Sequence, residues 1–171
     1  MDGLGFIHEK LDIKILILYV LRRLPAPIDG EKLGDLVLID GGIGYFDYKQ
    51  CLSELVDNAQ VEESEDAYVI TAKGSHNGEI LENSLPYSVR SKAERAIGPV
   101  AEEMRRSALI LANHECSDAG VTVYLSMSDG MGSIFDLKIL AADEEQALRM
   151  ERHFKKNAER LYHHFVDELS Q

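Results

Sequence analysis

The sequence predicts an α+β protein in which helices and a short hairpin are followed by further helices and a second hairpin. Three observations support this class. Apolar residues recur at helical spacing over residues 11–24 and 147–169. Strand-forming residues alternate with polar ones over 120–128 and 133–141, and an Asp-Gly pair between these runs indicates a tight hairpin turn. The length of 171 residues suits one ordinary domain or two small ones.

The composition excludes several broad classes of protein. The chain has 18 basic and 30 acidic side chains, a net charge of -12, which argues against non-specific adhesion to nucleic acid or to anionic membranes. Cys51 and Cys116 lack the spacing of a zinc site or a disulfide framework. The apolar run at 13–21 contains Lys14 and is shorter than the roughly 20 residues that a membrane span needs. We therefore expect a cytoplasmic protein that makes no membrane contact.

Three helices are expected in the first 60 residues. The first covers about residues 11–24, and the second follows Asp29, whose side chain can cap its first turn. The third is expected to start at a capping box formed by Asp47 and Gln50, with Phe46 packed on the following turn. Its inward face consists of Cys51, Leu52, Leu55 and Val56.

A hairpin is expected directly after the third helix, in the segment VEESEDAYVITAKG at 61–74. Strand-forming residues at 68–70 follow an acidic turn. The acidic side chains of this segment are Glu62, Glu63, Glu65 and Asp66. Three helices and a hairpin are the order of a winged helix-turn-helix, so residues 1–76 are assigned to a winged helix-turn-helix domain.

Residues 77–171 are assigned to a C-terminal α/β domain for dimerisation or sensing. Pro99 lacks an amide hydrogen and predicts a break in the helical stretch around it. Asp143 and Gln146 repeat the spacing of a capping box and predict the start of a long final helix. The expected elements are a helix over 78–85, a helix over 88–113 broken at Gly98 and Pro99, the hairpin of 120–128 and 133–141, and a helix from Asp143 to about 169.

Four features together resemble a known family. They are KILILYVLRRL at 14–24, GYFDYKQCLSELVDNAQ at 44–60, YVITAKG at 68–74 and the hairpin with a long helix that ends the chain. With them the chain resembles the bacterial family called domain of unknown function 4364, whose members are predicted winged-helix transcriptional regulators. The most specific residues are Tyr45, Phe46, Gln50, Leu52, Leu55, Ile70, Thr71, Lys73 and Gly74. The third helix is more acidic here than that pattern, through Asp47, Glu54 and Asp57.

The candidate DNA-binding residues lie on the third helix: Tyr45, Tyr48, Lys49, Gln50 and Ser53. Amides can bind adenine edges, lysine can reach guanine or phosphate, and tyrosine hydroxyls can hold phosphates. Residues 1–78 carry 7 basic and 14 acidic side chains, a net charge of -7, so an ordinary solvated face is the competing interpretation. Support must come from Lys10, Lys14, Lys32, Lys49 and Lys73.

We therefore expect a transcriptional regulator that binds double-stranded DNA with its third helix in the major groove. The alternative is a winged-helix interaction module whose acidic surface binds a basic protein and not DNA. The basic run between residues 90 and 106 fits either a solvated helix face or a second phosphate contact. The sequence predicts no operator, no effector ligand and no direction of regulation.

No constellation typical of an enzyme, cofactor site or metal site stands out. The glycine-rich stretch LVLIDGGIGYF at 36–46 would need a preceding strand and a parallel βαβ unit to bind a nucleotide, so a turn between two helices is favoured. His163 and His164 point about 100° apart on a helix and do not chelate together easily. We expect no enzymatic activity, no cofactor and no metal ion.

The last helix has an apolar stripe that is wider than a two-stranded hairpin can cover. The stripe consists of Met150, Phe154, Leu161, Tyr162, Phe165 and Val166. A lone subunit would expose part of it, so we expect a homodimer. The candidate interface residues are Phe154, Leu161 and Phe165.

Overall fold

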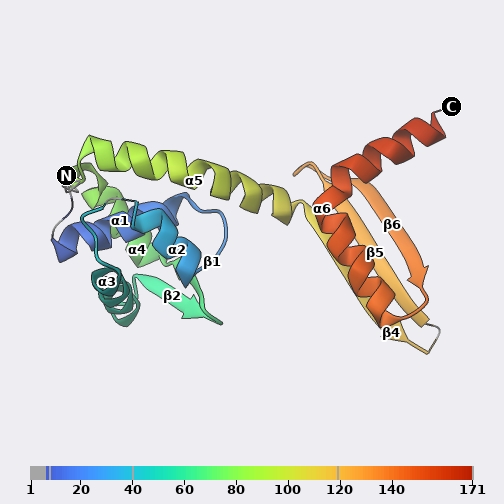
Figure 1. The fold of residues 1–171 in the computed structure, drawn as a ribbon, viewed down its shortest axis with the longest axis horizontal. Helices are drawn as coiled ribbons and strands as arrows, with labels where there is room; N and C mark the ends of the chain where they lie inside the picture. Colours follow the sequence, from blue (N-terminus) through green and yellow to red (C-terminus); the bar gives the residue numbers. More distant parts are fainter. Residues whose placement is uncertain (1–6, 8, 40, 119, 171) are drawn as a thin grey trace. The chain divides into compact units, whose positions relative to one another are not determined.

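The computed structural model describes residues 7, 9–39, 41–118 and 120–170. The protein is a mixed α+β structure with two small antiparallel sheets and a long C-terminal helix (Figure 1). It divides into two compact units, Met1–Met104 and Arg105–Gln171. Each unit has its own hydrophobic cluster. No helix in the described part of the chain is both long and apolar enough to cross a membrane.

The first unit is mainly helical and contains one three-stranded sheet. Its elements are α1 (Lys10–Arg23), β1 (Ile28–Asp29), α2 (Gly30–Val37), α3 (Tyr45–Asp57), β2 (Val61–Ser64), β3 (Ala67–Ile70), α4 (Ala72–Leu81), the 3₁₀-helix η1 (Glu82–Ser84) and α5 (Tyr87–Ala108), whose last residues belong to the second unit. Asp29 caps α2 as predicted, because its carboxylate accepts hydrogen bonds from the amides of Glu31 and Lys32.

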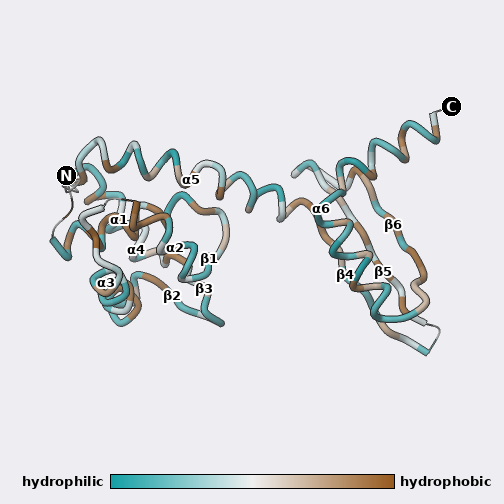
Figure 2. The backbone as a smooth tube through the Cα atoms, viewed as in Figure 1, coloured by the Kyte–Doolittle hydropathy of each residue, from teal (hydrophilic) through white to brown (hydrophobic). Residues whose placement is uncertain are grey.

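Helix α1 forms the centre of the first unit. Every side chain from Ile15 to Leu21 is buried, so the helix has no solvent-facing side over two turns. A helix that is apolar all round needs neighbours on all sides. Helices α2, α3 and α4 pack against it, and the inward residues of α5 join the same cluster. In Figure 2 brown, hydrophobic segments occur within the first unit, whereas much of α5 is teal.

Helix α4 begins at Ala72, whereas the sequence predicted that residues 71–74 end the hairpin. Thr71 caps this helix, and its hydroxyl accepts a hydrogen bond from the Gly74 amide at 3.0 Å. Two glycines weaken the helical signal in the sequence. The structure explains both, because a Cβ atom at Gly74 would overlap the carbonyl oxygen of Gln60, and one at Gly78 would lie 2.8 Å from Cδ of Arg22. Glycine therefore allows α4 to approach α1 closely.

The first compact unit ends at Met104, whereas the sequence predicted a domain boundary after residue 76. The predicted boundary lies inside α4. The difference arises because α5 contributes Val89, Ala93 and Ile97 to the cluster around α1. The assignment of separate functions to 1–76 and 77–171 stays a prediction.

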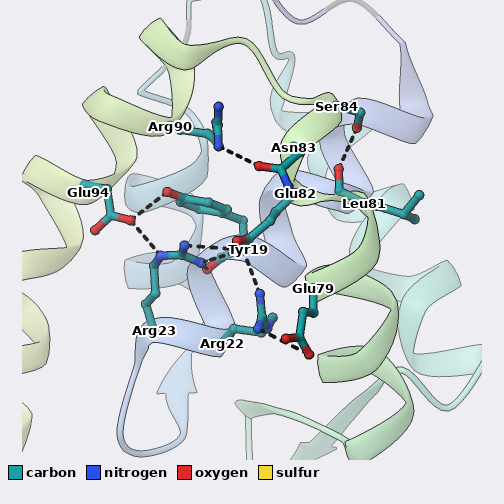
Figure 3. A network of polar contacts seen from close by, with 10 residues as sticks. All are labelled: Tyr19, Arg22, Arg23, Glu79, Leu81, Glu82, Asn83, Ser84, Arg90 and Glu94. Atoms are coloured by element: carbon teal, nitrogen blue, oxygen red, sulfur yellow. Dashed lines mark hydrogen bonds and ion pairs between the residues drawn. The ribbon is translucent and has the colours of Figure 1, made fainter.

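A polar network fixes α5 and η1 against α1 (Figure 3). The hydroxyl of Tyr19 donates to Oε1 of Glu94 at 2.6 Å, and Nε of Arg23 donates to the same oxygen at 2.7 Å. Arg22 donates to Oε2 of Glu82 at 2.6 Å. Burial and the hydrogen bond to Glu94 raise the pKa of Tyr19 to about 12, while the hydrogen bond from Tyr19 and the Arg23 guanidinium lower the pKa of Glu94.

The start of α3 differs from the prediction. The helix begins at Tyr45, and its N-cap residue is Gly44, which forms no side-chain cap. The predicted capping box of Asp47 and Gln50 is therefore wrong, and Phe46 is 87% exposed. The inward face is confirmed for Cys51, Leu52 and Leu55, which are buried, whereas Val56 is half-buried.

The sheet of the first unit has the strand order β1-β3-β2, and all of its pairs are antiparallel. Strand β1, with two residues, is too short to give a sequence pattern and was not predicted. The β2–β3 turn consists of Glu65 and Asp66, with φ angles of 50° and 63°. Two left-handed residues in succession match a type I′ turn, which favours asparagine and glycine. Glutamate is poorly suited to this conformation, and aspartate tolerates it less well than glycine does.

The second unit consists of β4 (Ile110–Ser117), β5 (Gly120–Ser128), β6 (Ser133–Ala141) and α6 (Glu144–Leu169), together with the end of α5. Its sheet has the order β4-β5-β6, and α6 packs on one face. The predicted strands β5 and β6 are confirmed. The cap of α6 is also confirmed: Asp143 accepts from the Gln146 amide, and the Gln146 side chain accepts from the amide of Ala142, both at 2.6 Å.

Strand β4 replaces the end of a predicted helix. The sequence predicted a helix over 88–113 with a break at Gly98 and Pro99, but α5 continues through Pro99 and ends at Ala108. Buried Ile110 and Ala112 alternate with exposed Leu111 in β4. This period of two could have indicated a strand, but it is short and follows a strongly helical segment directly.

The strained turn between β2 and β3 gives a prediction for stability. The double substitution Glu65→Asn and Asp66→Gly should raise the free energy of unfolding by about 1–2 kcal/mol, because asparagine and glycine adopt left-handed angles at a lower cost than glutamate and aspartate. Chemical denaturation of the full chain measures this change. Gly132→Ala, in the β5–β6 turn with open space around its Cβ position, is the control and should have little effect. An unchanged or lower stability of the double variant would contradict the account.

Candidate nucleic-acid interface

The outer face of α3 is polar and lies beside the sheet of the first unit. Gln50 and Ser53 are exposed, Lys49 is half-buried, and Tyr45 is exposed at the start of the helix. The rings of Tyr45 and Phe46 meet edge to face with their centroids 6.1 Å apart. Four of the five predicted DNA-binding residues are thus at least partly accessible on one helix.

Tyr48, the fifth predicted residue, does not lie on this face. It is fully buried, and its hydroxyl donates to the carbonyl oxygen of Gly30 at 2.9 Å. Burial raises the pKa of the Tyr48 hydroxyl. Its ring also lies against Gly34, where a Cβ atom would be 3.2 Å from Cε1. The predicted phosphate contact of Tyr48 is therefore wrong, because this side chain joins α3 to α2 inside the core.

The sequence contained a signal for the burial of Tyr48. It precedes Cys51 and Leu52 by three and four residues, which puts all three on the same side of a helix. The expected phosphate contact rested on the Tyr48 hydroxyl, whereas the spacing to Cys51 and Leu52 indicates the buried side of the helix. Burial also raises the pKa of the Cys51 thiol on the same side.

Gln50 takes part in a chain of polar contacts between α1 and α3. Nζ of Lys10 donates to its Oε1 at 2.7 Å, and its Nε2 donates to Oε1 of Glu54 at 3.0 Å. Glu54 in turn pairs with Nζ of Lys14 at 2.5 Å, and this contact lowers the pKa of the Glu54 carboxyl. Both ends of the Gln50 amide are therefore engaged. Binding to a base edge requires these two hydrogen bonds to be exchanged.

Lys49 does not join the contacts of Gln50 with Lys10 and Glu54. It lines a polar pocket next to the β2–β3 hairpin. The pocket has a volume of about 440 Å³ and is lined by Asp29, Gly30, Glu31, Lys49, Asp66 and Tyr68. The Lys49 ammonium is 5.8 Å from the ring centroids of both Tyr45 and Tyr48. Three carboxylates thus share the pocket with one ammonium group, and they offset its charge.

Lys32 and Lys73, two of the cations expected to support DNA binding, are engaged away from the exposed side chains of α3. Lys32 pairs with Asp29 at 3.4 Å, and Lys73 donates to the carbonyl oxygen of Asn58 at 2.7 Å, at the end of α3. Lys10 and Lys14 are the cations that contact α3 side chains directly. The positive charge that can reach DNA beside α3 therefore comes from Lys10, Lys14 and Lys49.

The tip of the hairpin is acidic and exposed. Glu62, Glu63, Glu65 and Asp66 are all exposed. Glu63 accepts a hydrogen bond from the Tyr68 hydroxyl at 2.6 Å, and this bond together with burial of the ring raises the pKa of Tyr68 to about 12. A duplex that followed the tip would place phosphates beside like charges.

The predicted dimer residues of α6 lie at different depths. Phe154 is buried and stacks on Phe135 of β6, with the ring centroids 6.0 Å apart. Leu161 is half-buried, and Phe165 is 39% exposed with its ring 5.5 Å from that of Phe135. Leu161 and Phe165 line one side of an apolar groove of about 500 Å³, and Leu137 of β6 lines its floor. Phe154 supports this groove from within the core.

A histidine–carboxylate contact ties β4 to α6 and was not predicted. Nδ1 of His114 lies 2.5 Å from Oε1 of Glu151, and its Nε2 lies 3.8 Å from Glu144. No group of three or more histidine, cysteine, aspartate or glutamate side chains is placed to hold a metal ion among the residues that the structure describes.

These observations define an α+β protein with a polar outer helix face in one unit and an apolar groove in the other. The chain belongs to the family described as domain of unknown function 4364, which it matches over residues 13–169. No curated protein and no solved structure matches the chain. The family description supplies no ligand and no reaction, so the function must be argued from the residues.

Proposed function

We propose that this protein is a winged-helix transcriptional regulator without enzymatic activity that binds double-stranded DNA as a homodimer, with α3 in the major groove. One observation carries the proposal: three helices are followed by a hairpin, and a three-stranded sheet of order β1-β3-β2 leaves a polar side of α3 accessible. This order is typical of winged helix-turn-helix modules, and the argument from it is an analogy of fold. The chemistry of α3 supplies the rest.

The side chains of α3 suit contacts with base edges. Lys49 and Ser53 are four residues apart and project from the same side of the helix, with Gln50 beside them. The Gln50 amide can form two hydrogen bonds with an adenine edge, and lysine can bind guanine or a phosphate. Such binding would replace the contacts of Gln50 with Lys10 and Glu54 by contacts with DNA.

Glu54 acts as an internal competitor in this proposal. Its carboxylate holds Lys14 and accepts a hydrogen bond from Gln50. A DNA phosphate near α1 would compete with this carboxylate for the lysine. With three cations next to α3, one subunit makes few phosphate contacts, and we expect its affinity to be low and sensitive to salt. A dimer whose two subunits bind successive half-sites of one duplex has a higher affinity than a single subunit, because the second binding event is intramolecular.

The exposed end of α6 supports the dimeric state. Phe165, Val166 and Leu169 are large apolar side chains with exposed surface on the last turns of this helix. Phe165 also lines the apolar groove beside β6, so exposed apolar surface of the kind that marks interaction sites lies on both the helix and the groove. A second copy that covered this patch would place two α3 helices in one molecule.

The DNA contact is tested with the double variant Lys49→Ala and Gln50→Ala. A duplex is first selected from a random pool with the full chain, and fluorescence anisotropy then gives its Kd for each protein. The variant should bind about tenfold more weakly or worse, because each lost base contact costs roughly 1–3 kcal/mol. Lys156→Ala on α6 removes one charge outside the site and is the matched control. Equal Kd values for wild type and the double variant would exclude α3 as the contact.

The dimer is tested with Phe165→Glu. A charge in the apolar patch should dissociate the protein, because a buried unpaired carboxylate is costly. Sedimentation equilibrium at micromolar concentration should then show a monomer. Met131→Glu, at a residue that is 95% exposed in the β5–β6 turn, introduces the same charge outside the patch and should leave the dimer intact. A Phe165 variant that remains dimeric would reject this surface.

The acidic hairpin tip favours a second candidate function, an interaction module that binds a basic protein. We propose to separate the two by replacing Glu62, Glu63 and Glu65 with Gln and Asp66 with Asn. For a DNA-binding protein this change should increase the affinity for unselected duplex severalfold, because four repulsive charges disappear, and the increase should shrink at higher salt. The interaction module instead predicts loss of binding to a basic protein and no DNA binding by either form.

A further inference from the structure

Strand β6 is the open edge of the sheet in the second unit. It pairs with β5 on one side, and within the described residues no strand pairs with its other side. Helix α6 packs mainly over β4 and β5, while β6 lies at the outer edge of the sheet (Figure 1). An uncovered edge strand of nine residues is a template for pairing with another strand.

The sequence of β6 is complementary to itself when it is reversed about Leu137. We propose that two copies of the chain pair their β6 strands antiparallel, with Leu137 on a two-fold axis perpendicular to the sheet, and so form one continuous six-stranded sheet. The inference rests on the dimeric state proposed above and specifies its geometry, but it does not depend on DNA binding.

The proposed axis places residues of opposite charge next to each other. Asp136 of each copy faces Lys138 of the other, and this pair occurs twice. Both side chains are exposed on the sheet face that points away from α6. Opposite charges directly across a strand pair stabilise it, whereas like charges destabilise it.

Neither charge has an ion pair of its own within the described part of the chain. The Asp136 carboxylate accepts a hydrogen bond from the Ser133 hydroxyl at 2.5 Å. Nζ of Lys138 lies 5.3 Å from the ring centroid of Tyr124. The Asp136 carboxylate also accepts a hydrogen bond from Ser126. Among the described residues the partners of both charges are thus neutral groups, and each charge can still pair with an opposite one.

The charges also select this register over its neighbours. An axis through Asp136 would place the two Asp136 carboxylates opposite each other, and an axis through Lys138 would do the same with two ammonium groups. Of these three axes, only the one through Leu137 avoids such a repulsion, and no other axis places Asp136 opposite Lys138. The other edge strand, β4, contains Glu115 but no lysine or arginine, so it offers no equivalent pairing.

Apolar residues on both faces of β6 agree with the same axis. On the outer face, Ile134 is 43% exposed and Leu140 is 67% exposed. Ile134 of each copy would pack against Leu140 of the second copy. On the α6 face, Phe135 would lie opposite Ile139, and the groove of about 500 Å³ would adjoin its counterpart. A stable dimer buries roughly 800 Å² per partner. The joined grooves and the ends of α6 add apolar area that a strand pair alone lacks.

Charge reversal in the full chain tests the register. Asp136→Lys and Lys138→Asp each place like charges opposite one another at two symmetric positions, so each single variant should raise the dimer Kd about tenfold. An equimolar mixture of the two should form a heterodimer, because each lysine of one variant meets an aspartate of the other. The double variant should dimerise like the wild type. Sedimentation equilibrium gives the Kd values, and native mass spectrometry identifies the heterodimer.

A matched control and the contrary outcomes complete the test. Glu115→Lys makes the same change on β4 and should not alter the Kd. Single variants with the wild-type Kd, or weakened variants that neither mixing nor the double substitution restores, would overturn the proposed pairing. A wild-type monomer whose groove binds 1-anilinonaphthalene-8-sulfonate would also overturn it and would assign the groove to a small apolar ligand.

The same experiments separate this inference from the proposed function. Dissociation by Phe165→Glu without any effect of the β6 charges would keep the dimer but reject the β6 pairing. The pairing would stand and DNA binding would be rejected if the double variant or the mixture restored the dimer while the wild-type protein selected no duplex from the random pool.

Discussion

The first unit depends on the burial of α1 from all sides. Eight side chains of this helix are buried, with Ile13 and the run from Ile15 to Leu21 among them. Burial of a large aliphatic side chain stabilises a fold by about 1.5–3 kcal/mol, so no other helix of the unit contributes as much. The other helices must enclose α1. The hydrogen bonds of Tyr19 and Arg23 to Glu94 fix the last of them, α5, in place, while Arg22 holds η1 through Glu82.

The need to enclose α1 determines which side of α3 stays accessible to a ligand. The helix turns Cys51, Leu52 and Leu55 inward, and Tyr48 follows them because its hydroxyl can reach the Gly30 carbonyl oxygen. What remains outside is a polar face on which Gln50 binds Lys10 and Glu54, while Lys49 shares a pocket with three carboxylates. An acidic chain can bind DNA under these conditions only where phosphates displace such internal partners, which makes affinity dependent on dimerisation and on salt.

Local signals were sufficient to predict much of the fold. The apolar run of α1, the cap at Asp29, the Asp-Gly turn and the cap at Asp143 each fix an element by short-range chemistry. The errors occurred where packing decides: α4 contains Gly78 because it lies close to α1 and Gly74 because it lies close to the backbone of Gln60, and β4 follows a strongly helical segment. Spacing placed Tyr45, Lys49, Gln50 and Ser53 on the accessible side of α3 and misplaced Tyr48, while their binding of DNA stays a prediction. The partners of Gln50 and Lys49 could not be predicted, because Lys10, Glu31 and Asp66 approach them only in three dimensions.

The central claim is that DNA contacts the outer face of α3 and not the acidic tip. Backbone amide chemical shifts, measured while the selected duplex is added to the full chain, test it most directly. The account predicts that the largest changes occur at Lys49, Gln50 and Ser53, with smaller ones near Lys10 and Lys14, and that residues 62–66 change little. Changes concentrated at 62–66 with α3 unaffected, or no change anywhere on adding duplex, would contradict it.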